Sequence, residues 1–288
     1  MANVAFLGLG VMGYPMAGHI AAAGHDVTVY NRTTAKAEAW ALEHGGVNAK
    51  TPSAAAKGAD FVFCCVGDDP DVLAVALGND GAIPAMKQGA VFIDNSTVSV
   101  DVARQLYEAA SGNNVMTLDA PVSGGQAGAE NGALTVMIGG DQVDFDKAKD
   151  KIDCYSKKMK LLGPTGSGQL AKMVNQICIA GLVQGLSEGI NFGIKAGLKM
   201  EDVIEVISKG AAQSWQMENR YKTMIDDKFD FGFAVDWMRK DLKIAMDEAK
   251  NNGSLLPITE VVDKYYAEVQ AMGGNRWDTS SLIRRFRK

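Results

Sequence analysis

The chain has 288 residues, of which 47% are hydrophobic, and its formal net charge is -5 at pH 7. This length and composition can fill two domain cores, and the acidic balance argues against a nucleic-acid surface, which needs clustered lysine and arginine. The chain starts in a strand-like segment instead of a signal peptide, and no uninterrupted apolar run is long enough to span a bilayer. We therefore expect a cytoplasmic protein. The cysteines lack CxxC spacing and the histidines lie near the N-terminus, so neither a disulfide nor a metal site is expected.

The first predicted elements are a strand, a glycine-rich turn and a helix. Residues 4–9 form a compact apolar strand that runs into Gly8, Gly10 and Gly13, and residues 17–23 are predicted to be helical. A GxGxxG segment in this position lets the backbone turn tightly and approach the pyrophosphate of a dinucleotide. The candidate cofactor residues are Gly8, Leu9, Gly10, Val11, Met12 and Gly13. The alternative is an ordinary strand-to-helix turn.

The second predicted strand, residues 27–30, ends at a segment that distinguishes between cofactors. An acidic residue at this point would bind the ribose of NAD. The chain instead carries a neutral and basic set, Asn31, Arg32, Thr33 and Lys36. An amide next to a guanidinium, a hydroxyl and an ammonium suits a 2′-phosphate, so NADP is favoured and NAD is the alternative. In a purely structural interpretation, Thr33 caps the next helix and Arg32 is simply exposed.

Strands and helices continue to alternate through residue 162. Strands are predicted at residues 61–66, 90–93, 115–118, 134–138 and 159–162, and helices at residues 71–77, 102–110 and 143–151. This alternation is typical of a doubly wound parallel sheet, whose ligands bind beyond the carboxyl ends of the strands. The strand ends therefore add candidate cofactor neighbours, namely Val66, Gly67, Asp68, Ser96 and Thr97.

Two further segments carry candidate chemistry for a substrate. At another strand end, the successive N–H groups of Ser123, Gly124 and Gly125 can form a nest for a carboxylate, with a plain glycine turn as the alternative. Lys172 is a single positive charge among apolar neighbours near the start of a long buried helix, where burial would lower its pKa and allow proton exchange near neutral pH. Asn175 and Gln176 neighbour it on the helix. The alternative is a lysine that reaches solvent.

The long helix contains glycine at every fourth position: Gly181, Gly185, Gly189, Gly193 and Gly197. Each interior glycine costs about 0.5 to 1 kcal/mol, so we expect close packing in a core or a subunit interface as compensation. Only helical segments are predicted beyond it, at residues 201–209, 235–251 and 258–272. We therefore expect a dinucleotide-binding domain at residues 1–163 and an all-α domain at residues 164–288. The basic C-terminus is interpreted as a solvated tail: Arg284, Arg285, Arg287 and Lys288.

Four motifs together resemble the β-hydroxyacid dehydrogenase family, which includes 3-hydroxyisobutyrate dehydrogenase and tartronate semialdehyde reductase. The motifs are GLGVMGYPM at residues 8–16, DAPVSGG at 119–125, GPTGSGQLAKMVN at 163–175 and RKDL at 239–242. The resemblance covers the whole chain. It implies a Rossmann-type domain followed by an all-α domain, a long interdomain helix that helps to form homodimers or homotetramers, and NADP- or NAD-dependent hydride transfer to or from a small 3-hydroxy acid or its semialdehyde.

The resemblance also implies roles for individual residues. Lys172 matches the catalytic lysine, the residues at 123–125 match the substrate carboxylate site, and Asp241 matches an acid that lines the site. Asn175 and Gln176 leave open which amide contacts the substrate. Cofactor contacts are implied for Gly8, Gly10, Met12, Gly13, Asn31, Arg32, Thr33, Lys36, Val66, Thr97 and Lys240. An imine reductase-like enzyme and a non-catalytic cofactor-binding module are alternatives, but the corresponding relatives lack this lysine.

Overall fold

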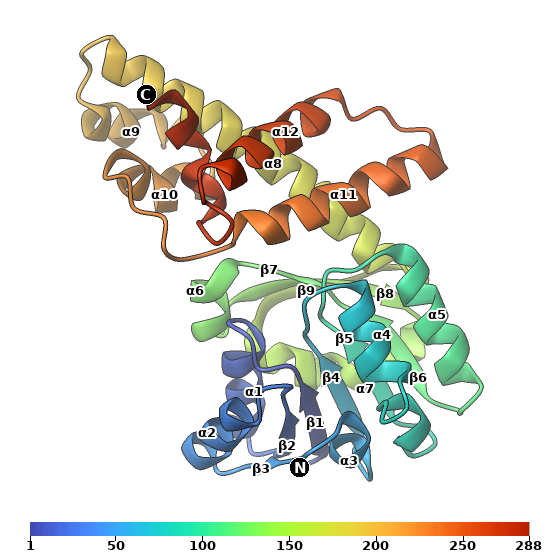
Figure 1. Ribbon diagram of the computed structural model, residues 1–288. Coiled ribbons are helices and arrows are strands. Elements are labelled where there is room, and N and C mark those ends of the chain that lie inside the picture. Colours follow the sequence, from blue (N-terminus) through green and yellow to red (C-terminus); the bar gives the residue numbers. More distant parts are fainter. Residues whose placement is uncertain (288) are drawn as a thin grey trace. The chain divides into compact units, whose positions relative to one another are not determined.

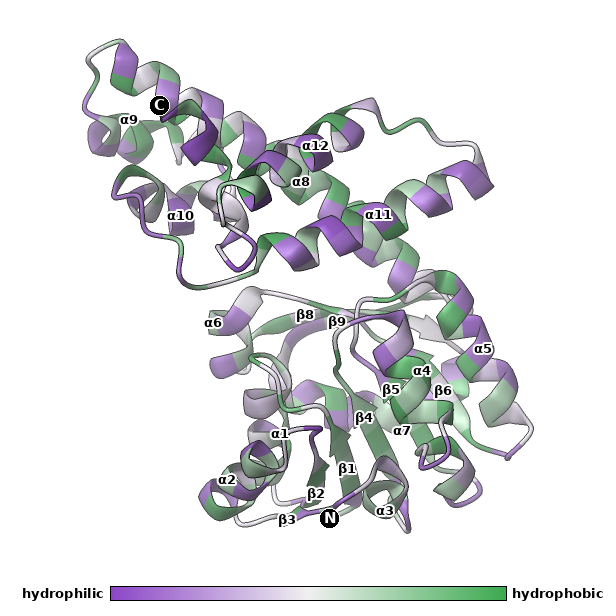
Figure 2. Cartoon of the chain, in the orientation of Figure 1, coloured by the Kyte–Doolittle hydropathy of each residue, from purple (hydrophilic) through white to green (hydrophobic). Residues whose placement is uncertain are grey.

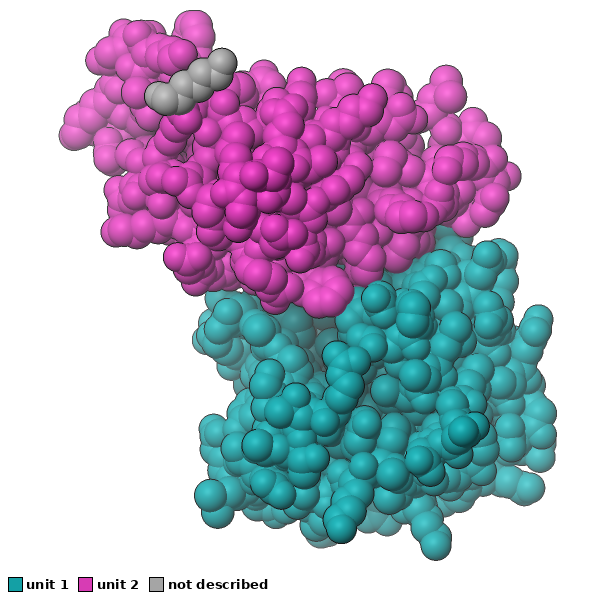
Figure 3. Space-filling model, viewed as in Figure 1, with its two compact units in different colours: residues 1–172 teal, residues 173–288 magenta. Residues whose placement is uncertain are grey.

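The computed structural model describes residues 1–287 and divides into two compact units, Met1–Lys172 and Met173–Lys288 (Figure 3). The division falls inside helix α8 (Ser167–Lys195), which continues from the first unit into the second. The first unit combines a sheet with helices, and the second is entirely helical (Figure 1). The predicted architecture, a Rossmann-type domain followed by a helical domain, is confirmed.

The first unit contains nine strands and seven complete α-helices. The strands are β1 (Asn3–Leu7), β2 (Asp26–Tyr30), β3 (Val47–Asn48), β4 (Phe61–Cys64), β5 (Val91–Asp94), β6 (Met116–Asp119), β7 (Val122–Ser123), β8 (Leu134–Gly140) and β9 (Ser156–Gly163). The helices are α1 (Gly13–Ala22), α2 (Thr34–His44), α3 (Pro52–Ala56), α4 (Asp69–Leu77), α5 (Val100–Ser111), α6 (Gly125–Glu130) and α7 (Gln142–Ile152), with 3-10 turns η1 (Ile83–Ala85) and η2 (Asp153–Tyr155).

The sheet is mixed, so the prediction of a parallel sheet is wrong at one side. Strands follow the order β3-β2-β1-β4-β5-β6-β8-β7, and β9 pairs with β8. From β3 to β6 in this order, each adjacent pair of strands is parallel, whereas β8 runs antiparallel to both β6 and β7. Too few residues separate β7 from β8 for the crossover that parallel pairing needs. Strand β9 lies parallel to β8 and presents the exposed lysines Lys157, Lys158 and Lys160.

Both faces of the sheet are covered by helices. Buried side chains of α1, α2 and α7 pack on one face around Trp40 and Tyr155, and those of α3, α4 and α5 pack on the other (Figure 1). Strands β1, β4 and β5 have mostly hydrophobic residues (Figure 2), because strands buried on both faces need apolar side chains in both directions. Because both faces are packed with apolar side chains, polar groups that could bind a ligand are expected at the carboxyl ends of the parallel strands.

Local sequence signals explain where several helices begin. The side chains of Thr51, Asp68 and Ser99 accept backbone N–H bonds at the N-termini of α3, α4 and α5. Such caps satisfy donors that have no partner inside the helix. Helix α1 begins at Gly13 instead of Ala17, directly after the glycine turn.

The second unit is built around the C-terminal part of α8. Its other helices are α9 (Met200–Ile207), α10 (Trp215–Ile225), α11 (Val235–Asn252) and α12 (Pro257–Ala271), followed by the 3-10 segment η3 (Thr279–Phe286). Ala180 and Val183 of α8 pack against α11 and α12, and Ile190 packs against α9 and α10. Helix α10 was not predicted from the sequence.

Helix α8 differs from its prediction in two respects. It is only partly buried: Val174, Leu182 and Phe192 are 62%, 45% and 73% exposed. It also ends at Lys195, so that Gly197, with φ of 78°, lies in the following turn. By length and composition alone α8 could cross a membrane, yet its inward side is part of the core of a helical bundle.

The C-terminal arginines are not a solvated tail, so that prediction is wrong. Arg284 pairs with Asp227 at 3.2 Å and lies over the Trp277 ring, and Arg285 pairs with Glu268 at 2.8 Å. Arg287 also contacts Asp227, at 3.0 Å. These partners are distant in sequence, and composition cannot reveal them. Lys288 lies outside the described residues.

Candidate functional site

The glycine turn, residues 8–13, is shaped by close backbone packing. Gly8 has φ of 98°, and a Cβ on it would run into the carbonyl oxygen of Cys65 at the end of β4. A Cβ on Gly13 would run into the carbonyl oxygen of Gly8. Both positions therefore require glycine to fold the turn against the neighbouring strand.

The N-terminus of α1 fits a dinucleotide pyrophosphate. A Cβ on Gly10 would meet nothing within 4 Å, and the first turn of α1 has neither an acidic residue nor a side-chain cap. The backbone N–H groups at such a helix start attract anions. The donors and the space present at this turn therefore suit a phosphate group.

The end of β2 holds the glycine turn from the other side. The Oδ1 atom of Asn31 accepts the N–H of Leu9 at 2.9 Å, and its Nδ2 donates to the carbonyl oxygen of Thr33 at 3.0 Å. Arg32 forms an ion pair with Asp71 of α4 at 3.1 Å, although its side chain is 85% exposed. Thr33 occupies the N-cap position of α2 without a side-chain cap bond, and Lys36 is exposed.

The segments after β4 and β5 are joined by polar contacts. The hydroxyl of Ser96 accepts the N–H of Val66 at 2.9 Å, and the carboxylate of Asp69 accepts the N–H of Ser99 at 2.9 Å. Gln169 of α8, which is fully buried, donates from Nε2 to the carbonyl oxygen of Ser96 at 2.9 Å. Two of the predicted cofactor neighbours, Val66 and Ser96, are therefore joined directly at the carboxyl edge of the sheet.

Lys172 lies beside the predicted carboxylate site. Its side chain is only 7% exposed, and Nζ donates to the carbonyl oxygen of Val122 at 3.0 Å. Ser123 ends β7, Gly124 has φ of 139°, and Gly125 begins α6. Lys172 is buried, whereas the other lysines of the first unit are exposed or half-buried. The structure thus brings together Lys172 and the Ser123 loop (residues 122–125).

In the second unit, α8 and α11 are joined by a chain of polar side chains. Asn175 donates from Nδ2 to Oε1 of Gln176 at 2.8 Å, and Gln176 donates from Nε2 to Oδ2 of Asp241 at 2.6 Å. Oδ1 of Asp241 lies 3.0 Å from Nζ of Lys240. Gln176 and Asp241 are each 2% exposed. Four of the predicted residues therefore form one network.

Burial controls the ionisation of two further groups in the first unit. It raises the pKa of the Asp119 carboxyl above its usual value, although backbone N–H groups of Gly166 and Gln169 oppose this shift. Burial also raises the pKa of the Cys64 thiol well above its usual range, so this cysteine is unsuited to nucleophilic chemistry. Among residues 1–287, no three His, Cys, Asp or Glu side chains are arranged to hold a metal ion.

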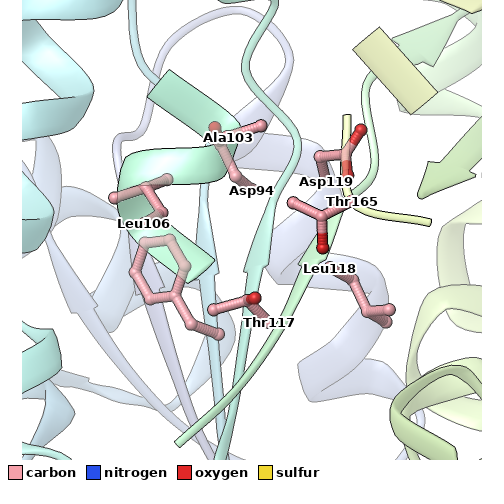
Figure 4. Close-up of a pocket in the computed structure, with 8 residues that line it drawn as sticks. Asp94, Ala103, Leu106, Thr117, Leu118, Asp119 and Thr165 are labelled. Carbon is pink, nitrogen blue, oxygen red and sulfur yellow. The ribbon is translucent and has the colours of Figure 1, made fainter. Parts of the chain in front are cut away.

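Asp119 also borders a small cavity at the end of β5 and β6. The cavity, of about 10 Å³, is lined by Asp94, Thr117, Asp119 and Thr165 together with apolar side chains of β5, β6 and α5 (Figure 4). A cavity of this volume can hold about one water molecule, so neither a nicotinamide nor a hydroxy acid can bind there. Asp119, Gln169 and Asp71 were not predicted as site residues, since their partners are distant in sequence.

Comparison with known proteins places the whole chain in one family. Residues 3–163 match the family model described as the NAD binding domain of 6-phosphogluconate dehydrogenase, and residues 166–286 match that described as NAD-binding of NADP-dependent 3-hydroxyisobutyrate dehydrogenase. The chain belongs to the β-hydroxyacid dehydrogenase family. It is accordingly an oxidoreductase with a nicotinamide cofactor.

Relatives in this family share the full length of the chain. An uncharacterized oxidoreductase of Shewanella frigidimarina is 63% identical over 100% of this chain and 99% of its own. The 2-hydroxy-3-oxopropionate reductase of Escherichia coli is 33% identical, covering 98% and 96%. The solved structure of Mycobacterium tuberculosis 3-hydroxyisobutyrate dehydrogenase with L-serine is 30% identical, covers 100% of both chains and has a TM-score of 0.89. The roles of individual site residues stay predictions.

Proposed function

We propose that this protein interconverts a small 3-hydroxy acid and its semialdehyde, with Lys172 as the general acid/base and NADP as the favoured cofactor. The observation that carries the proposal is the buried amine of Lys172 held 3.0 Å from the carbonyl oxygen of Val122, at the Ser123 loop. The 2-hydroxy-3-oxopropionate reductase and 3-hydroxyisobutyrate dehydrogenase relatives support this substrate class.

Each polar group then has a defined task. The nicotinamide, when bound, takes up or supplies the hydride. In oxidation, Nζ of Lys172 accepts the proton of the substrate hydroxyl, and in reduction it returns a proton to the carbonyl oxygen. The backbone N–H groups of the Ser123 loop bind the carboxylate. Asn175 or Gln176, one helical turn after Lys172, holds the reacting oxygen.

The favoured cofactor follows from the end of β2. Asn31 uses its amide to join the turns after β1 and β2, and it brings no negative charge near a 2′-phosphate. Arg32, Thr33 and Lys36 supply positive charge and hydrogen-bond donors at this point. Because Asp71 already pairs with Arg32, a 2′-phosphate has to compete with this carboxylate.

We further propose that the exposed face of α8 pairs with a second copy of the chain. Val174 and Phe192 are 62% and 73% exposed, and a Cβ on Gly185 or Gly189 would meet nothing within 4 Å. A helix surface without side chains allows close approach of another helix. This contact would offset the cost of the interior glycines.

The test is a comparison of Lys172→Ala with Lys195→Ala, an exposed lysine at the other end of α8. Substrate is first chosen by NADPH absorbance from a panel containing 3-hydroxyisobutyrate, L-serine, glycerate, succinic semialdehyde and 2-hydroxy-3-oxopropionate. Lys172→Ala should lower kcat by about 10²- to 10⁴-fold, the usual contribution of a general acid/base, with the Kd for NADPH unchanged. Near-normal kcat in this variant would refute the role of Lys172, and a panel without any turnover would refute the substrate class.

A further inference from the structure

The start of α8 is held by a carboxylate from another part of the chain. Asp119, the last residue of β6, accepts the N–H of Gly166 at Oδ1 (2.7 Å) and the N–H of Gln169 at Oδ2 (2.9 Å). The first turn of α8 contains no acidic residue of its own. Asp119 therefore acts as an N-cap supplied by tertiary structure, and its negative charge complements the helix dipole.

The backbone packs closely around the carboxylate of Asp119. Asp119 is 4% exposed. A Cβ on Gly139 would lie 2.5 Å from its Oδ1, and a Cβ on Gly168 would lie 2.8 Å from its Oδ2 and 2.5 Å from the carbonyl oxygen of Met137. Two glycines thus let the first turn of α8 and the end of β8 approach the carboxylate closely. Figure 4 shows Asp119 beside Thr165, next to the turn that leads into α8.

A second buried side chain fixes the same helical turn to the segment after β5. Gln169 is fully buried, donates to the carbonyl oxygen of Ser96 at 2.9 Å and accepts the N–H of Val98 at Oε1 (3.2 Å). The first turn of α8 is therefore attached to the strand end at Asp119 and to the segment that contains the predicted cofactor neighbours Ser96 and Thr97.

Lys172 follows Gln169 by three residues, so it lies above this anchored turn on the same helix. The carbonyl oxygen that Lys172 contacts belongs to Val122, which follows Asp119 by three residues. The bond from Gly166 to Asp119 and the bond from Lys172 to Val122 therefore both link the start of α8 to the segment at the end of β6. We propose that Asp119 is a positioning residue, which sets the register of α8 so that the amine of Lys172 faces the Ser123 loop, and that Gln169 assists it. This inference rests on the proposed catalytic role of Lys172.

Asp119→Asn is the informative change because it keeps the shape and removes one acceptor. The asparagine oxygen can accept only one of the two N–H bonds, and its NH₂ group then faces the other N–H donor. Lys172 would be displaced without loss of any group that touches substrate. A shift of about 1 Å at a reacting group can lower turnover about 100-fold. We expect kcat to fall about 10- to 100-fold, while KM for the cofactor changes less than about twofold.

The test is a double-mutant cycle of Asp119→Asn and Lys172→Ala, measured with the panel substrate that has the highest kcat/KM. If Asp119 acts through Lys172, Asp119→Asn lowers kcat strongly in the parent but less than about twofold in the Lys172→Ala background. Equal losses in both backgrounds would overturn the proposal, as would unchanged kcat in Asp119→Asn. If Lys172→Ala itself keeps its turnover, the proposed function fails instead.

Asp144→Asn is the matched control, because Asp144 is a buried carboxylate near the N-terminus of α7 with no bond to α8. It should leave kcat and the pH profile of kcat/KM unchanged, whereas Asp119→Asn should move the limb of that profile assigned to Lys172. If Asp119→Asn does not fold by circular dichroism, Gln169→Met takes its place in the same cycle with Lys172→Ala. Additive losses in that second cycle would overturn the proposal.

Discussion

Asp241→Asn should destabilise the helical unit strongly, although it exchanges one oxygen for one nitrogen. Asp241 is 2% exposed and accepts from Gln176 at 2.6 Å while pairing with Lys240 at 3.0 Å. An asparagine can present its oxygen to only one of these donors, so its NH₂ group opposes the other. An unsatisfied buried donor costs about 1 to 3 kcal/mol, and a buried charge that loses its partner costs about 3 to 5 kcal/mol.

Because the Lys240 side chain is 20% exposed and can turn toward water, we expect a loss of about 2 to 3 kcal/mol. At an m-value of about 2 kcal/mol per molar, this lowers the urea midpoint by about 1 M. Tryptophan fluorescence reports mainly on the relevant unit, since three of the four tryptophans, Trp215, Trp237 and Trp277, lie in it.

Asp247→Asn on the same helix provides the comparison. Asp247 pairs with Lys243 and Lys250, and its side chain is 46% exposed. Exposed pairs of this kind contribute about 0.2 to 1 kcal/mol, so the midpoint should hardly change. Equal shifts in the two variants would show that the network from Asn175 to Lys240 has no special stabilising effect.

Three further predictions concern the cofactor, pH and assembly. Arg32→Leu should raise KM for NADP about tenfold or more, because it removes a charge-assisted bond to the cofactor. Asp71→Asn should lower KM for NADP about two- to fivefold, because it releases Arg32 from its ion pair. Equal effects on KM for NAD in steady-state assays would contradict both predictions. Burial, with the nearby positive charge of Lys151, lowers the pKa of His25 below 6.5, so the folded state binds this proton more weakly than the unfolded state. The free energy of unfolding should therefore decrease as pH falls below 6.5, and His25→Gln should flatten that slope in urea titrations; an unchanged slope would refute the assignment. Gly185→Arg should shift the protein to a smaller species in light scattering after size exclusion, and Leu255→Arg, at a site 89% exposed in the turn after α11, should not; the same mass for both would exclude this face of α8.

Elements with a strong hydrophobic periodicity were predicted from the sequence. Elements whose conformation or direction depends on residues distant in the chain were missed. The alternation from β1 to β6 follows from apolar strands bounded by turn residues. The short helix α6 was missed because its glycines, Gly125 and Gly128, are typical of a turn. The direction of β8 could not be read from its apolar pattern, and only the short connection after β7 indicates it.

The candidate site shows the same division. The glycine turn and the Lys172 segment are local motifs, so spacing was enough to select them. The bond from Asn31 to Leu9, the pair between Arg32 and Asp71, and the attachment of α8 to Asp119 each join residues that are far apart in the chain. Single-sequence reasoning contains no signal for such pairs, because any exposed or buried acid could supply the partner.

The lysines on β9 have a consequence for handling the protein. Strand β9 pairs with β8 and, among the described residues, with no other strand, while the opposite edge of the sheet is the two-residue strand β3. A long edge strand with unpaired backbone groups is a template for aggregation, and charged side chains or very short strands suppress it. Lys157, Lys158 and Lys160 therefore act as gatekeepers. If they were replaced by small residues, for instance to reduce surface entropy for crystallisation, the edge strand would lose this protection and could pair with other molecules.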